Sequence, residues 1–172
     1  QYLDDNPTGT PADQYTIGVT LTDDDTGTDT GSTTTTITNV APVLADLAAS
    51  SVDENGTVHL TGTYTDTGSE DTHELTIDWG EGAAETVTVS GGSFDITHQY
   101  LDDNPTATTS DVYTIDVTLT DDDGDTATAS TTTTITNVAP SIDTLAATSV
   151  DENGTVHLTG TYSDTGTEDT HE

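Results

Sequence analysis

The sequence predicts an all-β protein built from repeated sandwich-like units. Apolar residues alternate with polar residues along several short segments, and turn signals such as Asn-Gly and Gly-Gly separate them. No segment shows the apolar period of a helix. Low hydrophobicity with high net charge is also typical of disorder, but the sustained period-two pattern favours an ordered fold.

An internal repeat sets the predicted domain organisation. The segment QYLDDNPT begins at Gln1 and again at Gln99, an offset of 98 residues, and two further segments recur with the same offset. Residues 1–74 and 99–172 are identical at 58 of 74 positions. A period this long indicates whole domains arranged as beads on a string, and we expect the array to extend in both directions. The predicted units are the C-terminal part of one repeat in 1–38, a complete repeat in 39–136, and the N-terminal part of the next in 137–172.

Predicted strands account for most of the complete repeat. In the clearest of them, Tyr113, Ile115, Val117 and Leu119 alternate with Thr and Asp. About seven strands per unit, with Trp79 on the third, indicate an immunoglobulin-like β-sandwich with Trp79 in its core. The other predicted strands are 57–64, 75–79, 87–89, 94–98 and a Thr-rich edge strand at 130–135.

Three motifs resemble those of the PKD domain family. They are DWGEG from Asp78, THQY from Thr97 and YTIDVTLTDDDGD from Tyr113. The first departs from the family's W-x-x-G-D-G-like turn, since it lacks the spacing residues and has Glu for Asp. The resemblance covers the complete repeat and both partial ones. It implies an extracellular immunoglobulin-like sandwich, often in tandem, that serves as a spacer or binding module, and some members bind calcium beside the linker that leads into the domain.

The net charge of the chain limits which molecules it can bind. The chain has no Lys or Arg and 33 Asp and Glu, which gives a formal net charge of −33. Such unbalanced charge opposes a compact state, so neutralising cations must come from outside as bound metal or dense salt. Nucleic acid is excluded and anionic membranes are disfavoured, because both require a basic surface. The absence of Cys excludes disulfides and thiolate chemistry.

Acidic loops predict calcium sites where repeats meet. Because the chain alternates between the two ends of a sandwich, we expect loops 65–72 and 120–125 beside the Asn39 linker. Loops 53–56, 80–82 and 101–105 should lie at the other end, beside the Asn137 linker. Carboxylate, carbonyl and amide oxygens suit a hard dication such as Ca²⁺. An isolated acidic tripeptide is usually a solvated turn, so this prediction depends on the loops converging.

The resemblance implies a core site of Asn39, Asp66 and Asp121, repeated as Asn137 and Asp164 in the next unit. The further predicted ligands are Asp4, Asp5, Asp23, Glu54, Asp71, Asp102, Asp103, Asp123 and Asp169.

Other constellations have simpler interpretations. Asn55 and Asn153 begin N-glycosylation sequons, but a tight Asn-Gly turn also explains them. We expect His98 to be a hydrogen-bonded core residue, His59 to face solvent and His73 to lie on a loop. Carboxylate pairs arise by chance in so acidic a chain, so we expect no enzyme.

The sequence therefore predicts an extracellular or cell-surface stalk or fibre, stiffened by calcium, whose partners are calcium ions, neighbouring repeats and other copies of the chain. Two alternatives stay open. One is a module that binds carbohydrate or protein, and the other is a halophilic protein whose acidic residues serve solvation.

Overall fold

The structure is a computed structural model of the chain, and it describes residues 2, 3, 5, 9–103 and 108–172. The predicted ligand Asp4 lies outside these residues. All regular elements in the described ranges are β-strands. No helix in the described part of the chain is long and apolar enough to span a bilayer.

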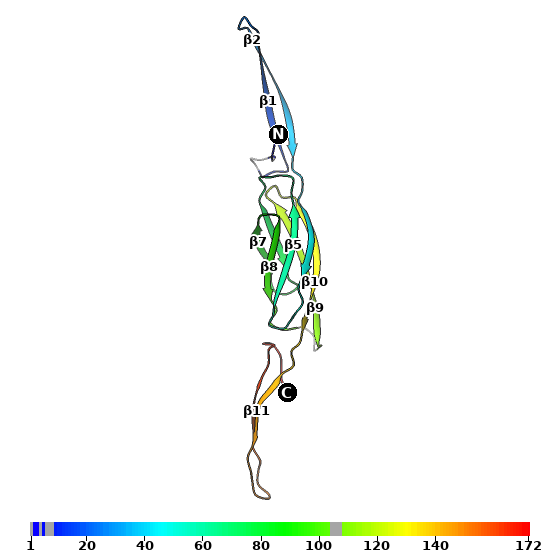
Figure 1. Cartoon of the computed structure of the whole chain (residues 1–172), viewed down its shortest axis with the longest axis vertical. Coiled ribbons are helices and arrows are strands. Elements are labelled where there is room, and N and C mark those ends of the chain that lie inside the picture. The colour runs from blue at the N-terminus through cyan, green and yellow to red at the C-terminus, as the bar shows by residue number, and fades with distance from the viewer. Residues whose placement is uncertain (1, 4, 6–8, 104–107) are drawn as a thin grey trace.

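The central part of the chain folds into two sheets that enclose one core (Figure 1). One sheet has the order β3-β5-β8 and the other β4-β10-β9-β6-β7. Neighbouring strands are antiparallel except for β4, which pairs in parallel with β10. This order gives an immunoglobulin-like sandwich and confirms the predicted all-β class. The strands are β3 (Val43–Ala49), β4 (Val52–Asp53), β5 (Thr57–Thr65), β6 (His73–Asp78), β7 (Glu85–Val89), β8 (Ser93–Gln99), β9 (Ser110–Asp121) and β10 (Thr126–Thr136).

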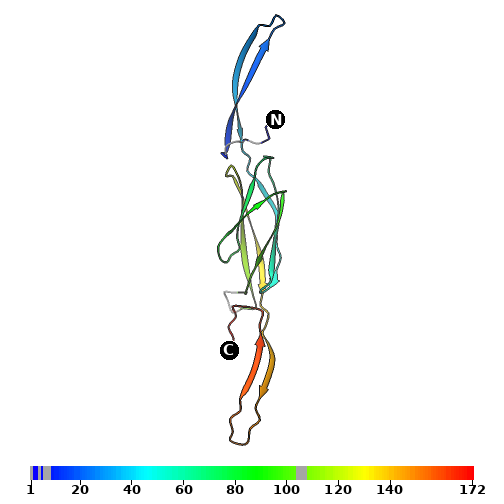
Figure 2. The same cartoon turned by 90° about the vertical axis from the view of Figure 1, so that its left-hand side faces the viewer.

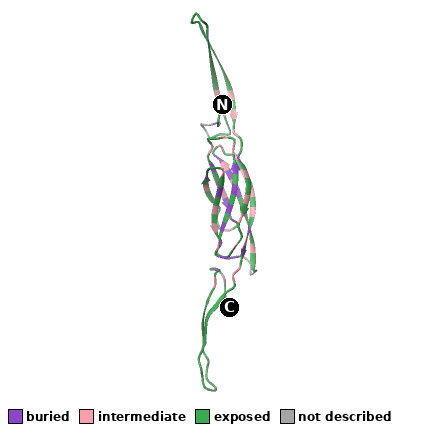
Figure 3. Ribbon diagram, in the orientation of Figure 1, coloured by how far each residue is buried: buried purple, intermediate pink, exposed green. Residues whose placement is uncertain are grey.

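The core follows the predicted alternation. Along β5 every second residue from Val58 to Tyr64 is buried, and the residues between them are exposed. The buried side chains of β9, in the opposite sheet, belong to the same core, and so does Trp79. The Tyr100 hydroxyl, also buried, donates to the carbonyl of Trp79 over 2.6 Å. Figure 3 shows that buried residues gather in this sandwich.

A two-stranded hairpin extends from each end of the sandwich (Figures 1 and 2). The N-terminal hairpin pairs β1 (Ala12–Thr22) with β2 (Thr28–Thr38), and the C-terminal hairpin pairs β11 (Ser141–Ala147) with β12 (Leu158–Ser163). Both repeat a pairing of the sandwich 98 residues away. Ala12 faces Thr38 as Ser110 faces Thr136, and Ser141 faces Ser163 as Val43 faces Thr65.

Two predicted features differ from the structure. The segment 130–135 is not wholly an edge strand, because β4 pairs with Ile135 and Thr136 at the end of β10. The strand β3 had no clear signal, because its register slips between Ala45 and Ala48 and Asp46 has a φ of 52°. A bulge of this kind interrupts the alternation by which a strand is recognised.

Candidate metal centres at the repeat junctions

Three carboxylates meet at the end of the sandwich where the chain enters it. Asp66 follows β5, Asp71 precedes β6, and Asp121 ends β9. One oxygen from each can be chosen so that all three lie within 4.8 Å of one another. We call these residues the linker cluster. The sheet brings them together, because the first residue of β6 pairs directly with Asp121.

Asn39 lies at this cluster but presents its amide nitrogen. Its Nδ2 donates to Asp121 Oδ2 over 2.9 Å and to Asp125 Oδ2 over 3.1 Å. Its Oδ1 accepts a hydrogen bond from the Val40 backbone N–H at 2.7 Å. In this geometry Asn39 ties the linker to the β9–β10 turn, whereas the resemblance implied an oxygen ligand. Asp125, which was not among the predicted ligands, completes this arrangement.

A buried histidine supports the linker cluster. His73 Nε2 lies 2.9 Å from Asp66 Oδ2, and the other Asp66 oxygen accepts from the Thr67 N–H at 2.6 Å. The loop position predicted for His73 is wrong, since it is the first residue of β6 and is buried. The same pair recurs 98 residues later, where His171 Nε2 lies 2.6 Å from Asp164 Oδ2.

The preceding segment also reaches the Asn39 junction. The Leu3 carbonyl accepts a hydrogen bond from the Ser69 N–H at 3.0 Å. Asp5 is only 2% exposed, and neither carboxylate oxygen has a hydrogen-bond partner among the described residues. Asp5, Asn39 and Gly68 line one small pocket. The first segment therefore adds a buried carboxylate at this junction.

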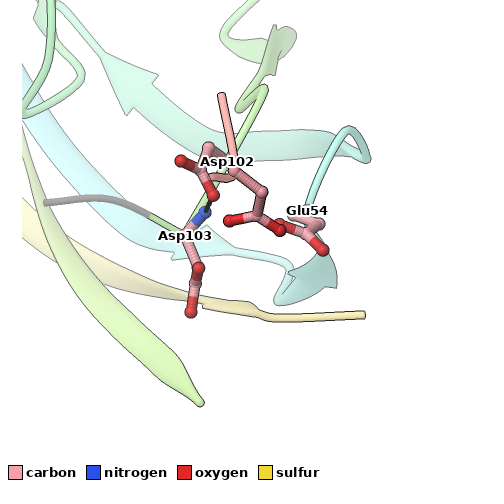
Figure 4. A group of neighbouring side chains, drawn as sticks. Glu54, Asp102 and Asp103 are labelled. Atoms are coloured by element: carbon pink, nitrogen blue, oxygen red, sulfur yellow. Dashed lines mark hydrogen bonds between the residues drawn. The ribbon is translucent and has the colours of Figure 1, made fainter. Parts of the chain in front are cut away.

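Four carboxylates meet at the opposite end of the sandwich. Glu54 lies in the turn after β4, Asp102 and Asp103 follow β8, and Asp169 comes from the segment beyond the Asn137 linker. One oxygen from each can be chosen so that all four lie within 4.8 Å of one another. Figure 4 shows Glu54, Asp102 and Asp103 side by side. We call these four residues the cross-repeat cluster.

The cross-repeat cluster is buried and only partly hydrogen-bonded. Glu54 is 2% exposed and Asp103 is 4% exposed. Glu54 Oε1 accepts from the Val138 N–H at 2.7 Å, and Asp102 Oδ1 accepts from the Asp103 N–H at 2.8 Å. Glu54 Oε2 and Asp103 Oδ2 have no hydrogen-bond partner among the described residues. A buried carboxylate oxygen without a partner is costly unless a cation or proton balances it.

Burial and mutual repulsion shift the ionisation of this cluster. Burial raises the pKa of Glu54, the charges of Asp169 and Asp102 raise it further, and the Val138 hydrogen bond opposes both. Burial also raises the pKa of Asp103 and of Asp169, and the charge of Asp102 adds to both shifts. In contrast, the pKa of Asp164 is lowered, mainly by its hydrogen bond with His171.

Four other predicted ligands belong to neither cluster, although one of them, Asp164, lies beside Asp169. Asp123 belongs to neither, and Asp23 caps its own hairpin turn, where its Oδ1 accepts from the Gly27 N–H at 2.6 Å. Asn137 contributes a backbone hydrogen bond of 3.2 Å to the Thr109 carbonyl. Asp164 is engaged with His171. None of these four joins the carboxylate groups found among the described residues.

The two sequon asparagines both have left-handed backbones, with φ of 60° at Asn55 and 64° at Asn153. This geometry fits the tight Asn-Gly turn. The side chain of Gln99 also donates to Asn55 Oδ1 over 2.9 Å.

The donor chemistry of both clusters fits a hard divalent cation. Every grouped atom is a carboxylate oxygen, which is the ligand type that Ca²⁺ and Mg²⁺ take. The chain has no Lys or Arg to balance these charges. The orphaned oxygens of Glu54 and Asp103 supply the second indication, because a bound cation would satisfy them.

Comparisons with known proteins add little. No protein-family model matches the chain, and no curated protein sequence matches it significantly. Among solved structures the chain is similar to the crystal structure of the chicken CNTN1 FN1-FN3 domains, with 15% identity and a TM-score of 0.33. The match covers 83% of this chain and 51% of the other, so the chain spans about half the length of its match. At this TM-score the similarity adds nothing to the fold assignment, which depends on the strand order.

Proposed function

We propose that this chain is part of an extracellular stalk or fibre of tandem PKD-like sandwiches, stiffened by calcium where successive repeats meet. The observation that carries the proposal is the convergence of buried carboxylates at both junctions of the central sandwich. On this proposal the chain has no catalytic role. Its function is to set the length and the stiffness of the array, and so the distance between the groups at its two ends.

The two junctions share a backbone geometry that supports a regular array. The Ser69 N–H donates to the Leu3 carbonyl at 3.0 Å, and 98 residues later the Thr167 N–H donates to the Leu101 carbonyl at 3.4 Å. The linker bond recurs in the same way, from Asn39 N–H to Pro11 at 3.1 Å and from Asn137 N–H to Thr109 at 3.2 Å. Figure 2 shows the two hairpins extending from opposite ends of the sandwich. Repeated contacts of this kind would support an array in which successive units stack in line.

Calcium would act by removing the repulsion at these junctions. Like charges a few ångströms apart resist docking, and a dication that both sides contact converts repulsion into attraction. Extracellular modules bind Ca²⁺ with a Kd of about 10⁻⁴ to 10⁻³ M. At ten times its Kd, each ion stabilises the folded state by about 1.4 kcal/mol.

The test compares the chain with Ca²⁺ and with EGTA at low ionic strength. We expect Ca²⁺ to raise the melting temperature followed by circular dichroism, and to increase the maximum dimension measured by small-angle X-ray scattering. Molar KCl without a divalent ion is the control for the halophilic alternative. The proposal would be contradicted if Ca²⁺ changed neither the melting temperature nor the maximum dimension. It would also be contradicted if KCl alone produced the same increases.

A further inference from the structure

The two clusters differ in which repeats supply their ligands. The linker cluster draws Asp66, Asp71 and Asp121 from the central repeat alone. The cross-repeat cluster draws three ligands from the central repeat and one, Asp169, from beyond the linker. A cation in the linker cluster would therefore be contacted by a single sandwich, whereas a cation in the cross-repeat cluster would be contacted from two repeats.

The neighbouring segment is fitted closely against Glu54. A Cβ at Gly166 would collide with Glu54 Oε2 and would lie 2.7 Å from Asp169 Oδ2. The same glutamate holds the linker through its other oxygen, which accepts from the Val138 N–H at 2.7 Å. Glu54 thus contacts the linker with one oxygen and leaves its second oxygen buried and without a hydrogen-bond partner among the described residues.

These orphaned oxygens indicate a ligand. Glu54 and Asp103 are each more than nine-tenths buried, and each carries one carboxylate oxygen that no described donor satisfies. The chain has no Lys or Arg to balance these four carboxylates. Protons could neutralise them singly, but a hard dication can be contacted by all four at once.

We propose that Glu54, Asp102 and Asp103 of one repeat and Asp169 of the next hold a hard divalent cation, Ca²⁺ in an extracellular setting, that latches the two repeats together. This inference rests on the proposed function and specifies which site joins the repeats. The linker cluster would stabilise a unit, and the cross-repeat cluster would fix one unit to the next.

The repeat also predicts that the two sites share a ligand. Asp169 lies 98 residues after Asp71, so the two are the same position in successive repeats. Asp71 belongs to the linker cluster and Asp169 to the cross-repeat cluster. Between two complete repeats, this one carboxylate would contact both ions. Binding at the two sites would then be coupled, and each junction would hold a pair of cations.

The experiment measures Ca²⁺ uptake by the full chain with Glu54→Gln and with Asp169→Asn. Each change removes one charged ligand from a different repeat, and we expect each to lower uptake by one ion per chain or to weaken that site at least about tenfold. The matched control is Glu152→Gln, at the exposed repeat equivalent of Glu54, which should leave uptake unchanged. Fluorescence of Trp79, in the sandwich core, checks that each variant folds.

Docking is followed separately by spin labels at Thr97→Cys and Thr155→Cys, since the chain has no Cys of its own. We expect Ca²⁺ to narrow the distribution of distances between the two labels when the cluster is unaltered. We expect no narrowing when the labelled chain also carries Glu54→Gln or Asp169→Asn.

Each outcome bears on a different claim. If Glu54→Gln lowers uptake and Asp169→Asn does not, the ion is held within one repeat and the latch is wrong. If neither variant changes Ca²⁺ uptake but Ca²⁺ still stiffens the chain, the latch is wrong and the proposed stalk still holds. A chain that takes up no Ca²⁺ overturns both. Loss of uptake and of docking in both variants, with Glu152→Gln unaffected, supports the latch.

Discussion

The central sandwich and the two flanking hairpins contain nearly the same sequence in opposite environments. Leu119 in the sandwich is 0% exposed, whereas Leu21, its equivalent 98 residues earlier, is 73% exposed. Leu60 is 0% exposed and its equivalent Leu158 is 68% exposed. The strand pairing is nevertheless the same, residue for residue, along β1–β2 and β9–β10.

This contrast separates two levels of structure. The pairing within a hairpin depends on local alternation and on the turn, so it recurs without the rest of the sandwich. Burial depends on the opposite sheet, which among the described residues packs only against the sheet that contains β9 and β10. Identical leucines should therefore contribute very differently to stability.

The largest expected effect comes from paired leucine truncations. Leu119→Ala opens a cavity in the core and should lower the free energy of unfolding by about 2–5 kcal/mol. Leu21→Ala removes an exposed side chain and should change it by no more than about 0.5 kcal/mol. Denaturant unfolding followed by Trp79, the single tryptophan, measures both in the same chain. Equal costs would mean that the first hairpin has a core contact absent from the structure.

The same contrast shows which parts of the fold the sequence could reveal. Period-two alternation predicted β5 through β9 because each has one buried and one exposed face. It did not reveal β3, where the bulge at Asp46 breaks the alternation. It also misplaced His73, because a buried His–Asp pair depends on Asp66, which lies in the preceding loop, and on the ring of Tyr64, 4.9 Å away.

The acidic groups were more predictable than their detailed geometry. Chain alternation between the ends of a sandwich placed Asp66, Asp71 and Asp121 together, and the structure groups these three. The orientation of the Asn39 amide and the part played by Asp125 could not be foreseen, because both depend on the path of the linker past the β9–β10 turn. Whether calcium occupies these groups stays a prediction.

A second pair of equivalent residues sharpens the comparison at a buried hydrogen bond. Tyr100→Phe leaves the buried Trp79 carbonyl without its 2.6 Å donor, so it should cost about 1–3 kcal/mol. Its equivalent Tyr2 is 46% exposed, and Tyr2→Phe should cost less than about 0.5 kcal/mol. Thermal unfolding of the two variants gives the difference, and a Tyr100→Phe variant as stable as the parent would show that water replaces the hydroxyl.

The smallest expected effect is a pH dependence of the calcium-free chain. Burial raises the pKa of Glu54, Asp103 and Asp169 above ordinary values of 4.5, 3.8 and 3.8. A carboxyl whose pKa is higher in the folded chain binds more protons when folded, so its contribution to stability grows as pH falls through the folded pKa and is complete below the unfolded value. In calcium-free buffer, stability should therefore rise as pH falls from neutral toward the ordinary carboxyl pKa values of about 4.

Glu54 and its exposed equivalent Glu152 give this pH prediction its control. Glu54→Gln removes one of the carboxyls whose pKa is raised. The variant should therefore be more stable than the parent at neutral pH, and its stability should rise less on acidification. Glu152→Gln should follow the parent, since Glu152 is exposed. The lowered pKa of Asp164 acts below this pH range, because the stability contributed by a carboxyl with a lowered pKa is lost only as pH falls through its folded pKa.

Saturating Ca²⁺ should reverse this dependence of stability on pH, since protons and metal compete for the same oxygens. Chemical denaturation at several pH values, with and without Ca²⁺, measures both slopes, and a calcium-free chain that only loses stability on acidification would contradict the repulsion inferred for the cross-repeat cluster.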